Sequence, residues 1–307
     1  MAYRYKLCIT IPTYNRETYL KRLLNSIISQ NSFSNEISVV INDWPSKDNT
    51  EKMVKEFQKQ YKNIFYYRNE KAVWMLPAIL ESMDMSNWEY TWLFWSDDFL
   101  ASDTLWNMLK CINEYHPKII YSRRKEVKYW EEIVDKETKL EILPFKWMSE
   151  FSKYLWDKTR WTFHDKDVIF TFMSVFCVDS DYYKESYDNL INNIWYSEDE
   201  LKKNYFNFNL ITLTNIENES SIIVIDNPIF VYCDLNHWRN PNLKIANDLK
   251  YLVKSIIIKY RIRKLNSLKF FLKLCFSWYI WSGIVPFLKK YKNLYSFIKR
   301  IFFIFKS

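Results

Sequence analysis

The chain has 307 residues, of which 49% are hydrophobic and 26% charged, and this composition supplies a buried core and excludes wholesale disorder. Its five cysteines include no close pair, which argues against a disulfide framework or a zinc site, and its charged first residues lead us to expect no signal peptide. The net charge of +8 is unevenly spread, since residues 244–307 carry +14 and the remainder −6, so it does not by itself indicate a nucleic-acid partner.

Strands and helices alternate over the first 121 residues of the predicted structure. Runs of β-branched and apolar residues predict strands, and apolar residues spaced like Leu20, Leu23, Leu24 and Ile27 predict helices. The expected order is a strand at 5–11, a helix at 17–30, a strand at 36–41, a helix at 50–61, a strand at 64–67, a helix at 76–85, a strand at 90–95, a helix at 102–115 and a strand at 118–121. This alternation favours an α/β fold with a mostly parallel central sheet and flanking helices.

The pattern is weaker after residue 122. Residues 123–163 are charged and aromatic without firm periodicity, and further strands are expected at 168–178 and 221–232. The shift to basic composition near Asn240-Pro241-Asn242 predicts a domain boundary there. We therefore expect a main domain at 1–240, with halves at 1–122 and 123–240, followed by a basic aromatic helical tail at 241–307.

Three polar clusters follow predicted strands, at residues 13–16, 42–43 and 96–98. In an open parallel sheet the carboxyl ends of the strands share one edge, which is where ligands bind. Tyr14 offers a flat face on which a base could stack, and Asp43 could accept a hydrogen bond from a pyrimidine N–H. Asp97 and Asp98 offer the hard oxygen ligands that Mg²⁺ or Mn²⁺ prefers, and such an ion could bridge a diphosphate leaving group. Taken singly, each aspartate could instead be a helix cap or a turn former.

The motifs in this order resemble those of glycosyltransferase family 2. The resemblance covers residues 5–115 or so and rests on five motifs: Ile9 to Arg16 with the leucines that follow, Asn42-Asp43 with Ser46, Asp48, Asn49 and Thr50, Tyr67-Arg68-Asn69, Glu89 to Leu93, and Ser96-Asp97-Asp98. It implies a GT-A fold and an inverting, metal-dependent transfer of a sugar from a nucleotide-diphosphate donor. Residues 1–122 would then form the nucleotide-sugar-binding half and residues 123–240 the acceptor half.

The resemblance also implies roles for individual residues. Tyr14 and Asp43 would contact the base, Arg68 would lie near the base or the phosphates, and Asp97 would contact the ribose or the sugar. Asp98 would be the firmer ligand of Mg²⁺ or Mn²⁺, with Asp97 beside it, because Ser96 occupies the first acidic position of the fullest family motif. The full set expected to bind the donor is Pro12, Tyr14, Arg16, Asp43, Arg68 and Asp97.

An inverting transferase needs a carboxylate that takes the proton of the acceptor hydroxyl. The family usually supplies it after the metal motif, and Asp199, with Glu198 beside it, is the best candidate. Asp165 and Asp167 are the alternatives, and residues 198–200 could instead be a solvated start of a helix. His237 could be a further metal ligand, although a lone histidine is more often structural.

The tail at 265–305 combines aromatic and aliphatic residues with lysine and arginine. Its longest uncharged run, 274–288, has 15 residues, whereas a membrane span needs about 20. The composition suits a helix lying in the interface of an anionic membrane, the alternative being a basic helical pair packed on the catalytic domain.

We therefore expect a peripheral protein on the cytoplasmic face of the cell membrane, acting in surface glycan synthesis on a polysaccharide, glycolipid or lipid-linked acceptor. One rival is a non-catalytic nucleotide-sugar or membrane-binding protein of the same fold. A second is an RNA-binding accessory protein, although the predicted metal site argues against a nucleic-acid partner.

Glycine and tryptophan occur in unusual numbers. Glycine averages about 7% of residues, roughly 21 here, yet the chain contains 1 glycine and 14 tryptophans. Trp44 and Trp88 fall in a predicted loop and a predicted turn, and Trp95 directly precedes Ser96-Asp97-Asp98; at all three positions the resembled family commonly has glycine. One hypothesis is that many of these residues are glycine in the natural protein, whose gene would use UGA as a glycine codon. The alternative is a truly tryptophan-rich chain, and Trp92, inside a predicted strand, is the tryptophan most readily retained.

Overall fold

A computed structural model of the chain describes residues 5–70, 88–127, 142–145, 173–193 and 222–233. Contacts group the chain into two compact units, formed by residues 1–148 with 172–237 and by residues 149–171 with 238–307, and all described residues belong to the first unit. Several predictions fall outside the described residues. They concern the helix at 76–85, the candidate residues Asp165, Asp167, Glu198, Asp199 and His237, and the basic tail.

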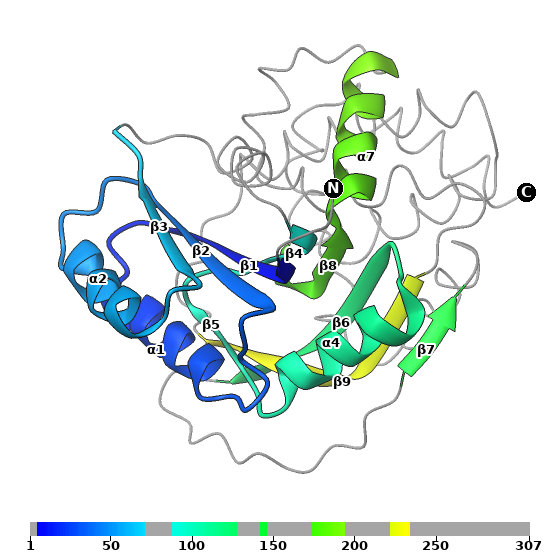
Figure 1. Cartoon of the computed structure of the whole chain (residues 1–307), viewed down its shortest axis with the longest axis horizontal. Coiled ribbons are helices and arrows are strands. Elements are labelled where there is room, and N and C mark those ends of the chain that lie inside the picture. Colours follow the sequence, from blue (N-terminus) through cyan, green and yellow to red (C-terminus); the bar gives the residue numbers. More distant parts are fainter. Residues whose placement is uncertain (1–4, 71–87, 128–141, 146–172, 194–221, 234–307) are drawn as a thin grey trace, which may run out of the picture. The chain divides into compact units, whose positions relative to one another are not determined.

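The first half of the sheet is parallel, as the alternating pattern predicts (Figure 1). Its strands stand in the order β3-β2-β1-β4. Their buried, β-branched residues suit a sheet covered on both faces. The elements are β1 (Tyr5–Thr13), α1 (Glu17–Ile28), β2 (Ile37–Asp43), α2 (Thr50–Gln60), β3 (Ile64–Arg68) and β4 (Trp88–Leu93).

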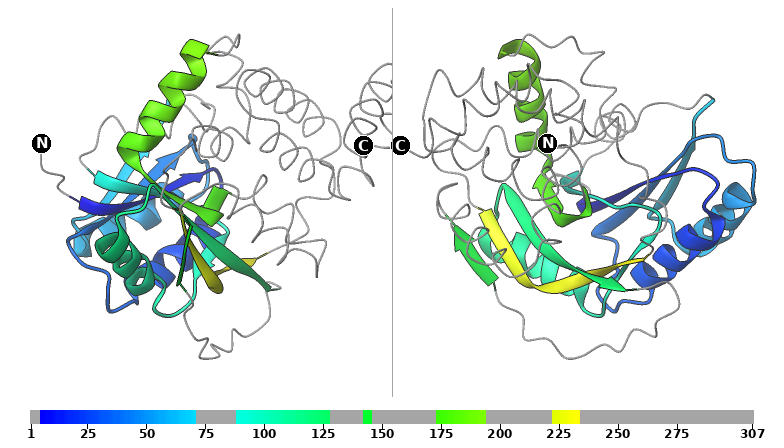
Figure 2. Two further views of the ribbon diagram at one scale, coloured as in Figure 1. Left: turned by 90° about the vertical axis from the view of Figure 1, so that its right-hand side faces the viewer. Right: turned by 180° about the vertical axis from the view of Figure 1, so that it is seen from behind.

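The predicted apolar face of α1 is the face that the structure buries. Leu20, Leu23, Leu24 and Ile27 are all 0% exposed. At the 3.6-residue period of a helix these positions form a single stripe, so burying the stripe holds α1 in place. The helix lies beside α2 and along β5 (Figures 1 and 2).

The second half of the sheet mixes strand directions. It continues from β4 as β8-β6-β9-β5, with β7 added on β9; β8 is antiparallel to β4 and β6, and β9 is parallel to β6 but antiparallel to β5 and β7. The expected α/β fold with a largely parallel centre is thus confirmed. The elements are β5 (Asp98–Leu100), α4 (Thr104–Tyr115), β6 (Ile119–Val127), β7 (Ile142–Phe145), a 3-10 turn (Met173–Val175), β8 (Phe176–Asp179), α7 (Ser180–Asn193) and β9 (Ile222–Cys233).

Two local features bear on the sequence predictions. In the part of the chain that the structure describes, no helix combines the length and the apolar character needed to cross a membrane. Among the described residues, Cys8, Cys111 and Cys177 are buried free thiols.

Candidate functional site

The carboxyl ends of the parallel strands meet at one edge and are joined by backbone hydrogen bonds. In the strand register Thr13 lies opposite Asp43, and Asp43 lies opposite Arg68. Beyond the ladder, the N–H of Trp44 donates to the carbonyl of Thr13 at 2.9 Å, and the N–H of Asn69 donates to the carbonyl of Asp43 at 3.0 Å. The structure therefore brings together the polar residues that the sequence places after β1, β2 and β3.

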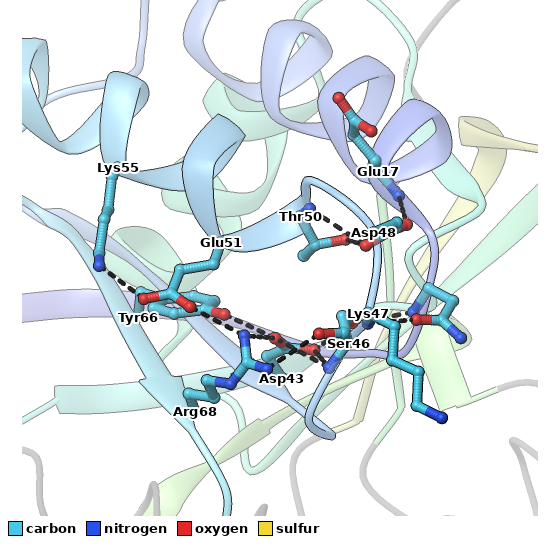
Figure 3. A network of polar contacts seen from close by, with 11 residues as sticks. Glu17, Asp43, Ser46, Lys47, Asp48, Thr50, Glu51, Lys55, Tyr66 and Arg68 are labelled. Carbon is cyan, nitrogen blue, oxygen red and sulfur yellow. Dashed lines mark hydrogen bonds and ion pairs between the residues drawn. The ribbon is translucent and has the colours of Figure 1, made fainter.

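Asp43 is the centre of a buried polar network (Figure 3). Its carboxylate is 0% exposed and accepts hydrogen bonds from the Ser46 N–H at 3.3 Å, from the Ser46 hydroxyl and from the Tyr66 hydroxyl at 2.5 Å. Burial, and then the bond to Asp43, raise the pKa of Tyr66, so this hydroxyl stays protonated as a donor. Asp43 is thus held in a fixed orientation at the strand ends.

Arg68 is the solvent-exposed member of this network. Its Nη1 lies 4.0 Å from Asp43 Oδ2 and donates to Glu51 at 2.8 Å, while its Nη2 donates to the Ser46 carbonyl at 2.9 Å. The Arg68 side chain remains 40% exposed. The structure thus places the half-exposed Arg68 beside the buried Asp43.

The loop after β1 is fastened to the loop after β2. Asn15 adopts a left-handed backbone with φ of 51°, which asparagine tolerates better than most residues. Its N–H donates to the Ser46 hydroxyl at 2.8 Å, and its side-chain oxygen accepts from the Lys47 N–H at 2.7 Å. Ser46 therefore contacts both Asn15 and Asp43, and so links the loop after β1 to the loop after β2.

Asp48 joins the first turns of two helices (Figure 3). Its carboxylate accepts from the Glu17 N–H at 3.1 Å, at the start of α1, and from the N–H and hydroxyl of Thr50 at 3.1 and 2.6 Å, at the start of α2. Burial opposes its ionisation, but the hydrogen bonds, foremost that of Thr50, lower the pKa of Asp48 overall. A charged carboxylate at two helix N-termini stabilises both, so this motif residue acts on the scaffold of the site.

Pro12, Tyr14 and Arg16 occupy different environments. Pro12 is buried near the end of β1, opposite Asn42. Tyr14 is 46% exposed, which leaves its ring accessible for stacking. Arg16 is directed to the acidic motif instead, since its Nη1 donates to Asp97 Oδ2 at 3.0 Å.

Asp97 and Asp98 lie where β4 passes into β5. Asp97 is 7% and Asp98 0% exposed, and Asp98 is the first residue of β5. Burial raises the pKa of Asp97, while the charge of Arg16 opposes that shift. Among the described residues no group of three or more His, Cys, Asp or Glu could hold a metal ion. Two adjacent carboxylates still fit Mg²⁺ or Mn²⁺, because such ions are commonly held by one or two carboxylates together with substrate phosphates and water.

Sequence reasoning did not identify Tyr66 as part of the site. Tyr66 and Arg68 are two residues apart in β3 and therefore point to the same face of the sheet. This two-residue alternation could have predicted Tyr66 as a site residue, since it places the tyrosine on the same face of the sheet as Arg68, which lies beside Asp43.

The tryptophans differ in how well the structure accommodates them. Trp92 is fully buried, and its indole N–H donates to the Ser174 carbonyl at 2.8 Å. The indole N–H of Trp44 is buried without a hydrogen-bond partner among the described residues, and so is that of Trp88. A buried donor left unpaired is destabilising. The turn predicted at Trp88 is wrong, because this residue begins β4 and packs with Tyr5, Cys8 and Val40.

The glycine hypothesis predicts a gain of function on reversion. If the hypothesis holds, replacing Trp44 and Trp95 by glycine should tighten donor binding by about tenfold or more, because an indole would take up volume in the segments beside Asp43 and Asp97 that glycine leaves open. Trp92→Gly is the matched control and should only destabilise, since it removes a well-packed strand residue. Donor binding can be followed by calorimetry, and Trp88→Gly can be added as a third reversion. Peptide mass spectrometry of the natural protein decides the matter: tryptophan found at 44, 88 and 95 would end the hypothesis.

Comparison with known proteins matches residues 8–192 to the family described as Glycosyl transferase family 2. The abequosyltransferase RfbV of Salmonella typhimurium is 43% identical over 96 residues, which make up 31% of this chain and 29% of that protein. The poly(ribitol-phosphate) beta-N-acetylglucosaminyltransferase TarS of Staphylococcus aureus is 26% identical over 123 residues, 40% of this chain and 21% of that protein. The matched segments thus span about a third of their relatives or less.

Solved structures share the fold over a larger part of the chain. The structure of S. aureus TarS 1-349 has a TM-score of 0.61 at 21% identity, covering 91% of this chain and 74% of that one. The mannosyltransferase PcManGT from Pyrobaculum calidifontis, in complex with GDP-Man and Mn2+, has a TM-score of 0.52 at 14% identity, covering 85% of this chain and 66% of that one. These likenesses confirm the expected GT-A fold.

Proposed function

Because the chain belongs to glycosyltransferase family 2, we propose that it transfers a sugar from a nucleotide-diphosphate donor to a glycan or lipid-linked acceptor. The observation that supports this most directly is the buried Asp43 network at the strand ends, on the same edge as the accessible Tyr14 ring. Donor binding needs a stacking surface and an acceptor for the base, and in our proposal Tyr14 supplies the first and Asp43 the second.

Each donor-side residue has a part in this proposal. Tyr14 stacks on the base, Asp43 accepts a hydrogen bond from a base N–H, and Arg68 contributes positive charge beside them. Asp98, with Asp97, would hold Mg²⁺ or Mn²⁺, and the ion would supply positive charge that stabilises the diphosphate leaving group. Arg16 keeps the Asp97 carboxylate turned toward the loop after β1, at 3.0 Å. Neighbouring structures in complex with UDP-GlcNAc and with GDP-Man and Mn2+ support a nucleotide-sugar donor and a divalent ion.

A glycan acceptor is supported by the relatives' names. They include an abequosyltransferase, a poly(ribitol-phosphate) beta-N-acetylglucosaminyltransferase and a minor teichoic acid biosynthesis protein. We take the acceptor to be a polysaccharide, glycolipid or lipid-linked sugar of the cell surface.

A screen of nucleotide sugars tests the function. Each donor is added with Mn²⁺ and thermal unfolding is recorded, since a ligand that binds only the folded state raises the unfolding temperature. Donors that stabilise the protein are then assayed for transfer and for hydrolysis. Stabilisation without any turnover would favour the rival, a non-catalytic nucleotide-sugar-binding protein, and no stabilisation by any donor would contradict donor binding altogether.

Asp199 is the proposed general base, with Glu198 beside it. Asp199→Asn should lower kcat by about 10²- to 10⁴-fold and leave donor affinity unchanged, because a general base acts only in the chemical step. Single-turnover kinetics and donor calorimetry separate the two quantities, and Glu200→Gln serves as the neighbouring control. Full turnover by Asp199→Asn would transfer the role to Asp165 or Asp167.

We further propose that the basic tail holds the protein on the cytoplasmic face of the membrane. Deleting residues 265–307 should weaken binding to anionic vesicles by about a hundredfold or more, since each basic residue near the surface contributes about 1 kcal/mol. Donor binding should persist. Lys289→Gln, Lys290→Gln and Lys292→Gln together in the full-length chain should weaken vesicle binding in the same direction. Equal binding of the deleted and full-length proteins to these vesicles would contradict the tail's role.

A further inference from the structure

One side of α1 carries polar residues that reach the segment containing Asp97 and Asp98. Arg22 and Ser26 are four residues apart and so share a face of the helix. The Arg22 Nη2 donates to the Asp97 carbonyl at 2.7 Å, and the Ser26 hydroxyl accepts from the Leu100 N–H at 3.0 Å. Helix α1 thus holds the backbone on both sides of Asp98.

Gln30, another four residues on, continues this row just after α1 ends. Its side-chain amide donates to the Ala101 carbonyl at 3.0 Å, and its side-chain oxygen accepts from the Leu105 N–H at 2.8 Å. Arg22, Ser26 and Gln30, here named the α1 ladder, therefore contact the backbone from residue 97 to the first turn of α4.

Arg22 also contacts a second neighbour of Asp98. Its guanidinium lies 4.7 Å from the ring centroid of Phe99, within the range of a cation–π interaction. Phe99 is only 5% exposed. Arg22 therefore binds the residue before Asp98 through its carbonyl and the residue after it through its ring.

The same helix begins at the loop that carries Tyr14 and Arg16. Arg16 holds the Asp97 carboxylate at 3.0 Å, while Arg22 holds the Asp97 carbonyl at 2.7 Å. The position of the acidic pair thus depends on the residue that precedes α1 and on a residue within α1, six positions apart. A packed helix is stiff, so these contacts tie the acidic pair to the base-binding loop.

We propose that Arg22 is a positioning residue, assisted by Ser26 and Gln30, which fixes the backbone around Asp98 so that its carboxylate meets a divalent cation in the correct orientation. This inference rests on the proposed glycosyl transfer. Mg²⁺ in particular demands near-ideal ligand geometry, and mutation of groups that orient a metal ligand typically costs about 10- to 100-fold in metal affinity. A contact that merely packed α1 onto β5 would affect stability alone.

The test compares substitutions at Arg22 with a matched change next to it. Arg22→Met removes the guanidinium but keeps a long apolar stem, Arg22→Lys keeps the charge, and Lys21→Met makes the same kind of change at an exposed position. MnCl2 is titrated into each full-length protein in the presence of UDP or GDP, and free Mn²⁺ is measured by electron paramagnetic resonance. Thermal unfolding without metal is recorded in parallel.

Arg22→Met should weaken Mn²⁺ binding by about tenfold or more, and Arg22→Lys should recover most of that loss. Ser26→Ala removes fewer atoms than Arg22→Met and disturbs the fold less; it should also weaken Mn²⁺ binding. Lys21→Met should leave Mn²⁺ binding unchanged. If Arg22→Met and Ser26→Ala lower the unfolding temperature but bind Mn²⁺ like the wild type, the ladder is structural and the inference is wrong while the proposed function stands. If the wild type binds no Mn²⁺ with either nucleotide, metal-assisted transfer and the inference fail together.

Discussion

Asp98→Asn is expected to abolish Mn²⁺-dependent donor binding and to reduce turnover by at least about a hundredfold. The change removes a negative charge from a fully buried position, 0% exposed, at the start of β5. A neutral amide is a poor ligand for a hard divalent ion, because it offers one carbonyl oxygen in place of a charged carboxylate. The measurement is turnover as a function of Mn²⁺ concentration, together with the Mn²⁺-dependent rise in unfolding temperature with donor present.

Asp103→Asn is the matched control for this variant. Asp103 lies five residues further on, is exposed, and has a left-handed backbone with φ of 58°, which asparagine adopts readily. The same chemical change at Asp103 should therefore leave fold and turnover unaltered. Asparagine fits β5 at position 98 as well, because the ladder there joins backbone atoms of Asp98 and Tyr232. Normal Mn²⁺-dependent turnover by Asp98→Asn would show that the metal assignment is wrong.

Asp43→Asn should weaken donor binding by about tenfold to a hundredfold, the usual loss when a hydrogen bond to a charged group disappears. It should also lower the unfolding temperature, because the carboxylate accepts from both Ser46 and Tyr66 in a fully buried site. The amide N–H groups of this variant would face the Ser46 and Tyr66 hydroxyls, which act as hydrogen-bond donors to Asp43 in the wild type. Donor affinity by calorimetry and stability by urea unfolding measure the two effects separately.

Tyr66→Phe separates recognition of the base from support of the fold. It removes the hydroxyl that lies 2.5 Å from Asp43 but leaves the carboxylate able to accept from a ligand. We expect a loss of stability of about 1.5–3 kcal/mol, the range for a hydrogen bond to a charged group, with donor affinity within a fewfold of the wild type. An Asp43→Asn protein that loses stability like Tyr66→Phe but binds donor normally would make Asp43 a scaffold residue.

Elements with local signals could be predicted from the amino-acid sequence. The spacing of Leu20, Leu23, Leu24 and Ile27 predicted both α1 and its buried face, because helical periodicity depends on neighbouring residues only. The runs that became β1 to β4 were recognisable from β-branched and aromatic residues with polar clusters at their ends. Since parallel strands share one carboxyl-end edge, the meeting of residues 13–16 with Asp43 followed from fold class alone.

Only the tertiary structure decided how the second half of the sheet is built. Strand β5 has three residues, too few to show a period, and it exists because β9 pairs with it. The antiparallel direction of β8 between β4 and β6 is set by packing of segments 55 or more positions apart in the chain, as in Thr91 opposite Val178 and Tyr121 opposite Phe176. For the same reason Trp88, predicted to lie in a turn, became part of β4.

The contacts that shape the site also depend on this long-range arrangement. Arg22 meets the Asp97 carbonyl 75 positions away, and Tyr66 meets Asp43 23 positions away. Nothing in the local sequence distinguishes Arg22 or Tyr66 from the other arginines and tyrosines of the chain. A hydrogen bond forms only where donor and acceptor come within about 3 Å at a favourable angle, and the order of strands in the sheet, with the seating of α1 along β5, is what brings these pairs to that distance.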